Sequence, residues 1–134
     1  DQFQHWVYTH PDHDRAARTQ QWLQICQRFQ SREIQWTGLE PMHESMWHRQ
    51  LHLFHHPFYY IEYGIAQLGA LQMWAQYQTD SDAALGRYRR ALSLGGTRKL
   101  PELFEAAGLR FDFSRATLEP LMQQLGKEIA KLPD

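Results

Sequence analysis

The sequence predicts an all-α fold, an irregular array of about six helices. Three observations carry this prediction. Apolar residues recur at helical spacing along most of the 134 residues. Proline and glycine divide the chain into blocks of helical length. Strand-like alternation is confined to residues 110–113, which are too few to build a sheet.

Two helices are expected before residue 36. Residues 1–9 are typical of the end of a helix that begins before residue 1. The second helix is expected to start near Thr9 or Pro11, which are plausible start signals. Its buried face is expected to consist of Trp22, Ile25, Cys26 and Phe29. Residues 36–38 then predict a turn.

Pro57 separates a third helix, over residues 39–56, from a long fourth one. Proline disfavours helical geometry in the residue before it, yet it is tolerated at the first position of a helix. The fourth helix is therefore expected to run from Pro57 to about Tyr77. It is rich in aromatic and small residues and carries little charge.

Two more helices are expected between residues 79 and 108. Residues 79–82 supply cap candidates for a helix that carries Leu85, Tyr88 and Leu92. Residues 95–96, both glycine, end this helix. A short helix over residues 101–107 begins with a proline and stops at a glycine.

The last helix is expected to be capped by Thr117. This start places Pro120 in the first turn, where a missing N–H is harmless. The buried stripe of the helix is expected to consist of Leu118, Leu121, Met122, Leu125, Ile129 and Leu132.

The composition indicates a globular protein and excludes some function classes. Hydrophobic residues make up 43% of the chain and charged residues 22%. The formal net charge of −1 gives no broad attraction to nucleic acid or to an anionic membrane. Polar residues interrupt the most apolar segment, so no run is long enough to cross a bilayer. The single cysteine, Cys26, fits a reducing compartment, so we expect a cytoplasmic protein without nucleic-acid or membrane partners.

The candidate functional side chains gather around Pro57. Tyr60 and Tyr63 share a face if both lie in one helix, because residues i and i+3 are neighbours there. The histidines His48, His52, His55 and His56 lie just upstream. Neutral phenols and imidazoles can donate hydrogen bonds to the oxyanion of a tetrahedral intermediate, although the same residue types also fit a half-polar core. Tyr59 is assigned to the core.

No nucleophile accompanies these donors. Cys26 lies on the apolar face of its helix, so it is expected to pack rather than to react. No serine stands in a GxSxG setting, and no GxGxxG or Walker pattern surrounds the glycines. An oxyanion site also needs a nucleophile, so on chemistry alone its absence counts against a catalytic role for these donors.

Two histidine patterns bear on metal binding. His43 and His48, in HESMWH, approach the HExxH motif but are five residues apart, about 140° around a helix, so they cannot grip one zinc ion. A second pattern recurs every four residues: Glu44, His48, His52 and His56. On a continuous helix this ladder could chelate a metal, or it could be a solvated polar stripe. No metal ligand is assigned within residues 1–134.

Three segments resemble the M3 family of zinc metallopeptidases. They are FQHWVYTHP, WHRQLHLFHHPFYYIEYGIAQLGALQMW and AAGLRFDFS, and the middle one is the most specific. The likeness is strongest to the oligoendopeptidase F group and weaker to thimet oligopeptidase. It spans nearly the whole chain but only the C-terminal part of the much longer catalytic domain of the family.

This resemblance implies a mostly helical, two-lobed enzyme around a deep channel. In the family an HExxH helix and a downstream glutamate hold zinc, and these residues are expected before residue 1. A histidine and two tyrosines three apart bind the substrate carbonyl and the tetrahedral intermediate. The tyrosines match Tyr60 and Tyr63, and His52 fits best as the histidine, with His55 and His56 as alternatives.

The leading hypothesis is therefore that residues 1–134 form one helical segment, the C-terminal portion of a zinc-dependent oligoendopeptidase that hydrolyses short peptides. The segment alone is expected to be inactive. Its partners would be short peptide substrates and the remainder of the peptidase, with self-association through exposed apolar surface. The alternatives are a non-catalytic helical module that binds peptides or proteins, and a small metal-binding protein that uses the histidine ladder.

Overall fold

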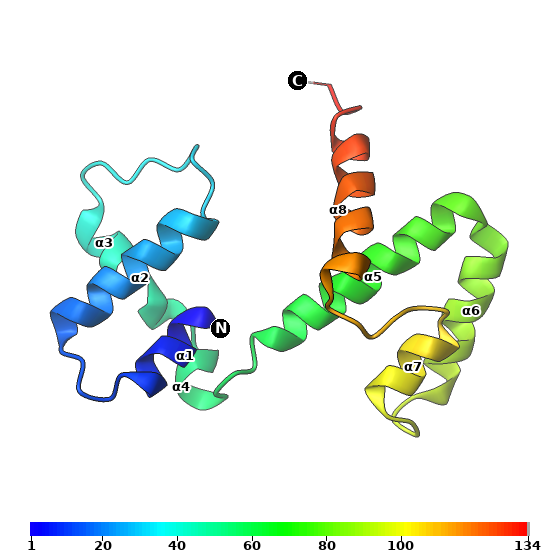
Figure 1. Ribbon diagram of the computed structural model, residues 1–134, viewed down its shortest axis with the longest axis horizontal. Coiled ribbons are helices and arrows are strands. Elements are labelled where there is room, and N and C mark those ends of the chain that lie inside the picture. Colours follow the sequence, from blue (N-terminus) through cyan, green and yellow to red (C-terminus); the bar gives the residue numbers. More distant parts are fainter. Residues whose placement is uncertain (134) are drawn as a thin grey trace. The chain divides into compact units, whose positions relative to one another are not determined.

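The computed structural model describes residues 1–133, and every regular element among them is a helix (Figure 1). The prediction of an all-α fold is confirmed. The chain divides into two compact units, the first ending at Tyr63 and the second starting at Gly64. That residues 1–134 form one segment of a larger catalytic domain stays a prediction.

The first unit contains four α-helices and a 3-10 helix, and α5 begins at its end. The elements are α1 (Gln2–Thr9), α2 (Arg15–Phe29), α3 (Glu40–Ser45), the 3-10 helix η1 (Met46–Arg49), α4 (His52–His55) and α5 (Ile61–Thr79). Phe3 of α1 is buried, and its ring meets those of Trp22 and Trp47 at centroid distances of 5.2 and 5.5 Å. These tilted and edge-on contacts are the favoured geometries for aromatic pairs.

Helix α2 begins later than the sequence predicted. Its cap is Asp14, whose carboxylate accepts a hydrogen bond from the backbone N–H of Ala17 at 2.7 Å. The predicted start near Thr9 is wrong because the Thr9 hydroxyl donates to the carbonyl of His5 and belongs to the end of α1. Of the predicted apolar face, Cys26 is buried, whereas Phe29 at the end of the helix is 66% exposed.

The predicted third helix, residues 39–56, is broken into α3, η1 and α4. The hydroxyl of Ser45 donates to the carbonyl of Pro41 at 2.8 Å, a side-chain bond of the kind that bends helices. The chain then continues in 3-10 geometry, and Trp47 packs against Phe3. The packing of Trp47 against Phe3 therefore accompanies a break in the helix that the sequence predicted as continuous.

Helix α5 starts at Ile61 and not at Pro57. Residues 57–60 form a turn in which Phe58 has φ +62°, a left-handed conformation that no right-handed helix accommodates. Tyr59 and Tyr60 consequently precede the helix, and only Tyr63 lies in its first turn. Helix α5 ends at Thr79, close to the predicted end.

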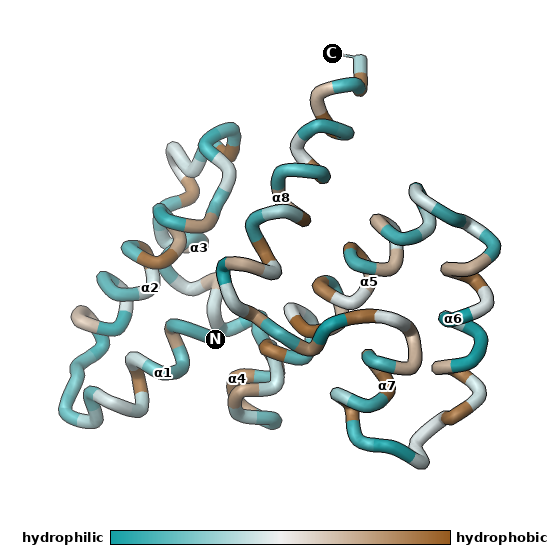
Figure 2. Tube along the Cα trace, turned by 45° about the vertical axis from the view of Figure 1, so that its right-hand side comes forward, coloured by the Kyte–Doolittle hydropathy of each residue, from teal (hydrophilic) through white to brown (hydrophobic). Residues whose placement is uncertain are grey.

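The second unit holds most of α5 together with α6 (Ser81–Leu94), α7 (Leu100–Ala106) and α8 (Arg115–Ile129). Asp80 caps α6 through the N–H of Ala83 at 3.0 Å, and Gly95, with φ +52°, ends it as predicted. Gly108, with φ +71°, has a backbone conformation that a right-handed helix cannot contain, and it follows the end of α7. Figure 2 shows hydrophobic and hydrophilic residues following one another along these helices.

Helix α5 packs closely against α7. A Cβ added at Gly69 would lie 3.1 Å from Cζ of Phe104, so this glycine lets the ring approach the helix. The buried carboxamide of Gln72 forms two hydrogen bonds with Arg110, accepting from its N–H at 2.8 Å and donating to its carbonyl at 2.9 Å. These bonds hold the segment 109–113 beside α5, where it forms no strand.

Helix α8 begins at Arg115 with Ser114 as its cap residue, so the prediction of Thr117 as the cap is wrong. The carboxylate of Asp112 accepts hydrogen bonds from the N–H and the hydroxyl of Ser114 and from the hydroxyl of Thr117. This acceptor, absent from the sequence argument, allows an earlier start. Pro120 therefore lies inside the helix. Three members of the predicted buried stripe are exposed: Met122, Ile129 and Leu132.

Candidate functional site

Four side chains form a cluster where α4, the 57–60 turn and α5 meet. We call His52, Tyr59, Tyr60 and Tyr63 the His–Tyr cluster. His52 opens α4, Tyr63 lies in the first turn of α5, and the other two tyrosines come from the turn. The imidazole centroid of His52 lies 4.9, 5.1 and 5.9 Å from the phenol rings of Tyr59, Tyr60 and Tyr63. All four residues belong to the first unit.

Tyr63 presents its hydroxyl to His52. The distance from the Tyr63 Oη to Nε2 of His52 is 3.5 Å, a long contact at the limit of a hydrogen bond. The two rings meet edge to face, with an interplanar angle of 89°. Tyr63 is 53% exposed, so its hydroxyl can also reach a molecule outside the protein. Which of the two groups donates depends on the tautomer of His52.

The hydroxyl of Tyr60 is already engaged. It donates to Oε1 of Gln50 at 2.5 Å, and both side chains are half-buried. A phenol has one O–H to donate. Tyr60 can therefore donate to a bound molecule only by leaving Gln50, whereas the Tyr63 hydroxyl has no acceptor other than His52 among residues 1–133. The two tyrosines, equivalent in the sequence, differ in their readiness to donate.

Tyr59 does not belong to the core, so that assignment is wrong. It is 43% exposed, and its ring stacks on the imidazole of His52 with an interplanar angle of 13°. The helical spacing behind the core assignment does not apply, because residues 57–60 form a turn. Sequence reasoning also missed Gln50, since nothing in its spacing links it to Tyr60 once the helix is broken.

His52 is the histidine that contacts both Tyr60 and Tyr63. His56 lies 6.0 Å from the ring of Tyr59 and 6.1 Å from that of His52, and His55 neighbours only His56 among these rings. The geometry therefore favours His52 over the two alternatives as the partner of the tyrosines. Its role at an active site stays a prediction.

The histidine ladder loses its basis, because its residues do not share a continuous helix. Glu44 lies in α3, His48 in η1 and His52 in α4. Among residues 1–133, no group of three or more histidine, cysteine, aspartate or glutamate side chains is placed to hold a metal ion. Burial raises the pKa of the Cys26 thiol, which keeps it protonated and unreactive.

The comparisons with known proteins agree with this helical structure. The family described as Peptidase family M3 matches residues 1–123. The chain therefore belongs to peptidase family M3. No curated protein matches it.

Within this family, the chain is similar to a solved X-ray structure whose description names oligoendopeptidase F. The identity is 30% and the TM-score 0.80, and the match covers 98% of this chain. It covers only 23% of the other chain, so the present sequence spans about a quarter of that protein. The predicted resemblance to a part of an oligoendopeptidase F-like peptidase is confirmed.

Proposed function

We propose that this chain is part of a zinc-dependent oligoendopeptidase that hydrolyses short peptides, and that the His–Tyr cluster stabilises the oxyanion in its active site. Membership of peptidase family M3 supports the reaction class. The single observation that supports the site is the exposed Tyr63 hydroxyl, 3.5 Å from Nε2 of His52. Zinc in the parent enzyme would activate the attacking water. In this proposal the zinc ligands lie on the remainder of the peptidase, and none is assigned to this chain.

The chemistry asked of the cluster is hydrogen-bond donation. When water attacks a peptide carbonyl, the carbonyl oxygen becomes negatively charged, and donors already in place lower the energy of that state. Tyr63 can serve as such a donor through its phenol O–H. If His52 carries its proton on Nε2, it donates to the Tyr63 oxygen and leaves the Tyr63 proton free to point at the substrate.

Tyr60 has the smaller role in this proposal. Its proton is directed at Gln50, and donation to an oxyanion would break a 2.5 Å hydrogen bond. The net gain from such an exchange is small, because one hydrogen bond replaces another. Tyr63 is therefore the principal donor. Tyr60 supplies a second donor only when a bound substrate replaces Gln50 as the acceptor of its O–H.

The remainder of the peptidase is the proposed partner of the apolar surface. No large side chain among residues 1–133 is fully buried, and many apolar ones are exposed. Residues of α5, α6 and α7, including Trp74, Leu85 and Phe104, line an open groove of about 570 Å³. Exposed apolar surface of this extent marks an interaction site, and coverage of 23% of the related structure leaves a large share of that protein to provide the contact.

The experiment that tests the proposal is replacement of Tyr63 by Phe in the complete peptidase. The change removes one hydroxyl and keeps the ring, so kcat should fall while KM stays nearly constant, as expected for an interaction made mainly in the transition state. An unchanged kcat would show that Tyr63 is not an oxyanion donor.

A further inference from the structure

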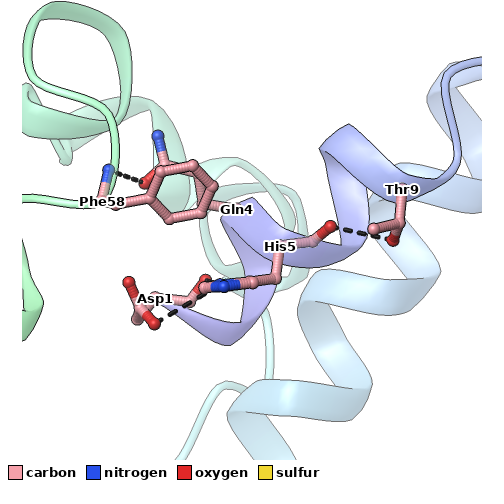
Figure 3. Close-up of polar contacts among 5 residues, drawn as sticks. All are labelled: Asp1, Gln4, His5, Thr9 and Phe58. Atoms are coloured by element: carbon pink, nitrogen blue, oxygen red, sulfur yellow. Dashed lines mark hydrogen bonds and ion pairs between the residues drawn. The ribbon is translucent and has the colours of Figure 1, made fainter.

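The side chain of Gln4 joins two backbone groups that are distant from it in the sequence, one in α4 and one within the 57–60 turn. Its Oε1 accepts a hydrogen bond from the N–H of Phe58 at 2.7 Å (Figure 3), and its Nε2 donates to the carbonyl of Leu53 at 3.2 Å. Gln4 is 4% exposed. A buried carboxamide with both ends bonded to backbone acts as a clamp, because no water replaces either bond.

The chemistry of the two partners fixes the orientation of this amide. A backbone N–H can only donate, so the oxygen of Gln4 must face Phe58. A carbonyl can only accept, so the nitrogen must face Leu53. Rotating the amide by 180° would place like groups together at both ends. The site therefore requires an uncharged group with one donor and one acceptor, which glutamine supplies.

The clamp encloses the segment that joins the two arms of the His–Tyr cluster. Leu53 directly follows His52, and Phe58 directly precedes Tyr59 and Tyr60. Between them the chain leaves α4 and passes Pro57, which has no N–H to donate. Gln4 thus sets how far the backbone that carries His52 lies from the backbone that carries the tyrosines.

Phe58 needs such support because its backbone is strained. A φ of +62° costs a non-glycine residue about 1–3 kcal/mol. Helix α1 holds the residue on two sides: Gln4 binds its N–H, and the rings of His5 and Tyr8 contact its ring at centroid distances of 4.6 and 5.5 Å.

Helix α1 packs against α2 and η1 of the first unit through Phe3. The buried ring of Phe3, next to Gln4, meets the rings of Trp22 and Trp47. The chain of contacts therefore runs from this aromatic core through Gln4 to both arms of the His–Tyr cluster.

We propose that Gln4 is a positioning residue for the His–Tyr cluster, holding Leu53 and Phe58 so that His52 stays in register with Tyr59 and Tyr63. The inference rests on the proposed function for its catalytic consequence and on geometry alone for its structural one. Gln4 itself touches no reacting atom. It acts by setting the stacking of His52 on Tyr59 and the contact between His52 and the Tyr63 hydroxyl.

The chain offers a matched control for this clamp. Gln72 is also a buried glutamine that binds backbone at both ends, through Arg110, but it lies in the second unit. Gln4→Met and Gln72→Met each remove two hydrogen bonds and keep a side chain of similar length. Both should lower stability, whereas only Gln4→Met should disturb the cluster.

The first measurement follows the His52 ring in the complete peptidase by NMR, with labelled histidine and the His52 signal assigned by its loss in His52→Gln. Stacking on Tyr59 displaces this signal by its ring current. In Gln4→Met the signal should move toward the position of an unstacked imidazole, and in Gln72→Met it should stay. Should Gln4→Met not fold, Gln4→Asn replaces it: the neutral amide remains but is one methylene shorter, so it cannot keep both backbone hydrogen bonds and a smaller movement is expected.

The second measurement is kinetic. Gln4→Met should lower kcat by about tenfold to a hundredfold with KM nearly constant, since misplacement by about 1 Å has effects of this size. In the double variant with Tyr63→Phe the loss should be less than the product of the single losses, because both changes act on one interaction. Gln72→Met should leave kcat within about twofold, because both hydrogen bonds that it removes are to Arg110 of the second unit.

These outcomes separate the two claims. An unmoved His52 signal in Gln4→Met, or equal losses of kcat in Gln4→Met and Gln72→Met, would overturn the positioning role. An unchanged kcat in Tyr63→Phe would overturn the proposed function, while the His52 signal would still decide whether Gln4 positions the ring.

Discussion

The imidazole of His52 lies on the phenol ring of Tyr59, with centroids 4.9 Å apart and ring planes inclined by 13°. This stack fixes the plane of the imidazole, and Nε2 lies 3.5 Å from the oxygen of the Tyr63 hydroxyl. Tyr59 therefore has a defined relationship to the candidate site although its own hydroxyl has no assigned role.

Replacing Tyr59 by Phe should leave kcat of the complete peptidase within about twofold, because the stacking ring is kept. Tyr59→Ala removes the ring, frees the imidazole and should lower kcat by about tenfold, in line with an aromatic pair worth about 0.5–1.5 kcal/mol. Steady-state kinetics on a short peptide measures both values. Equal activity of the Ala variant and the wild type would show that His52 needs no support from Tyr59.

Gly69 provides a test of packing between α5 and α7. An added Cβ would lie 3.1 Å from the Phe104 ring, so Gly69→Ala forces the ring to move, which costs about 1–3 kcal/mol. Alanine recovers up to about 1 kcal/mol of helix propensity, and the net effect should be a loss of stability of roughly 1 kcal/mol. Urea unfolding measures it.

Gly64, in the same helix, is the matched control for this substitution. A Cβ added there meets nothing within 4 Å, so Gly64→Ala should raise stability by about 0.5–1 kcal/mol through helix propensity alone. A stabilising Gly69→Ala would contradict this prediction and show that the Phe104 ring yields to the added Cβ at little cost.

Asp112 makes the start of α8 sensitive to acid. Hydrogen bonds from the Thr117 hydroxyl, then from the hydroxyl and N–H of Ser114, lower its pKa from the ordinary 3.8 to about 2. A carboxylate with a lowered pKa contributes stability that is fully present above the unfolded value and lost as the pH falls through the folded one. The contribution should therefore disappear between about pH 4 and pH 2.

The Asp112→Asn variant tests this assignment, since its side chain cannot titrate. It should be less stable than the wild type at pH 7 and should lose less stability between pH 4 and pH 2. Asp82, exposed in the first turn of α6, is the control, and Asp82→Asn should keep the wild-type acid response. The same acid response in wild type and Asp112→Asn would assign the pH dependence to another group.

The sequence predicted elements well where their ends depend on local chemistry. Asp80 and Gly95 act on their own neighbours through a cap and a left-handed residue, and both were recognised. The prediction failed between residues 39 and 61, where distant contacts decide. Trp47 packs on Phe3, and Phe58 is held by Gln4. Neither contact leaves a periodic signal.

The candidate site shows the same division. The types and approximate neighbourhood of His52, Tyr60 and Tyr63 could be read from the sequence and from the family resemblance. Their arrangement could not be predicted. The sequence argument placed both tyrosines on one face of a helix, whereas Tyr60 precedes the helix that contains Tyr63. The engagement of Tyr60 by Gln50 and the stacking of Tyr59 on His52 follow from the turn, which arises from tertiary support of a strained Phe58.

The most direct test of the proposed function compares tyrosine-to-phenylalanine variants of the complete peptidase in kcat and KM. Loss of a single oxyanion donor typically lowers kcat by about 10²–10³-fold, and Tyr63→Phe should approach this range with KM little changed. Tyr60→Phe should have a smaller effect, and Tyr77→Phe, at an exposed tyrosine of the second unit, almost none. A Tyr63→Phe enzyme with the kcat of the wild type, or one no slower than Tyr77→Phe, would contradict the assignment of the His–Tyr cluster to oxyanion stabilisation.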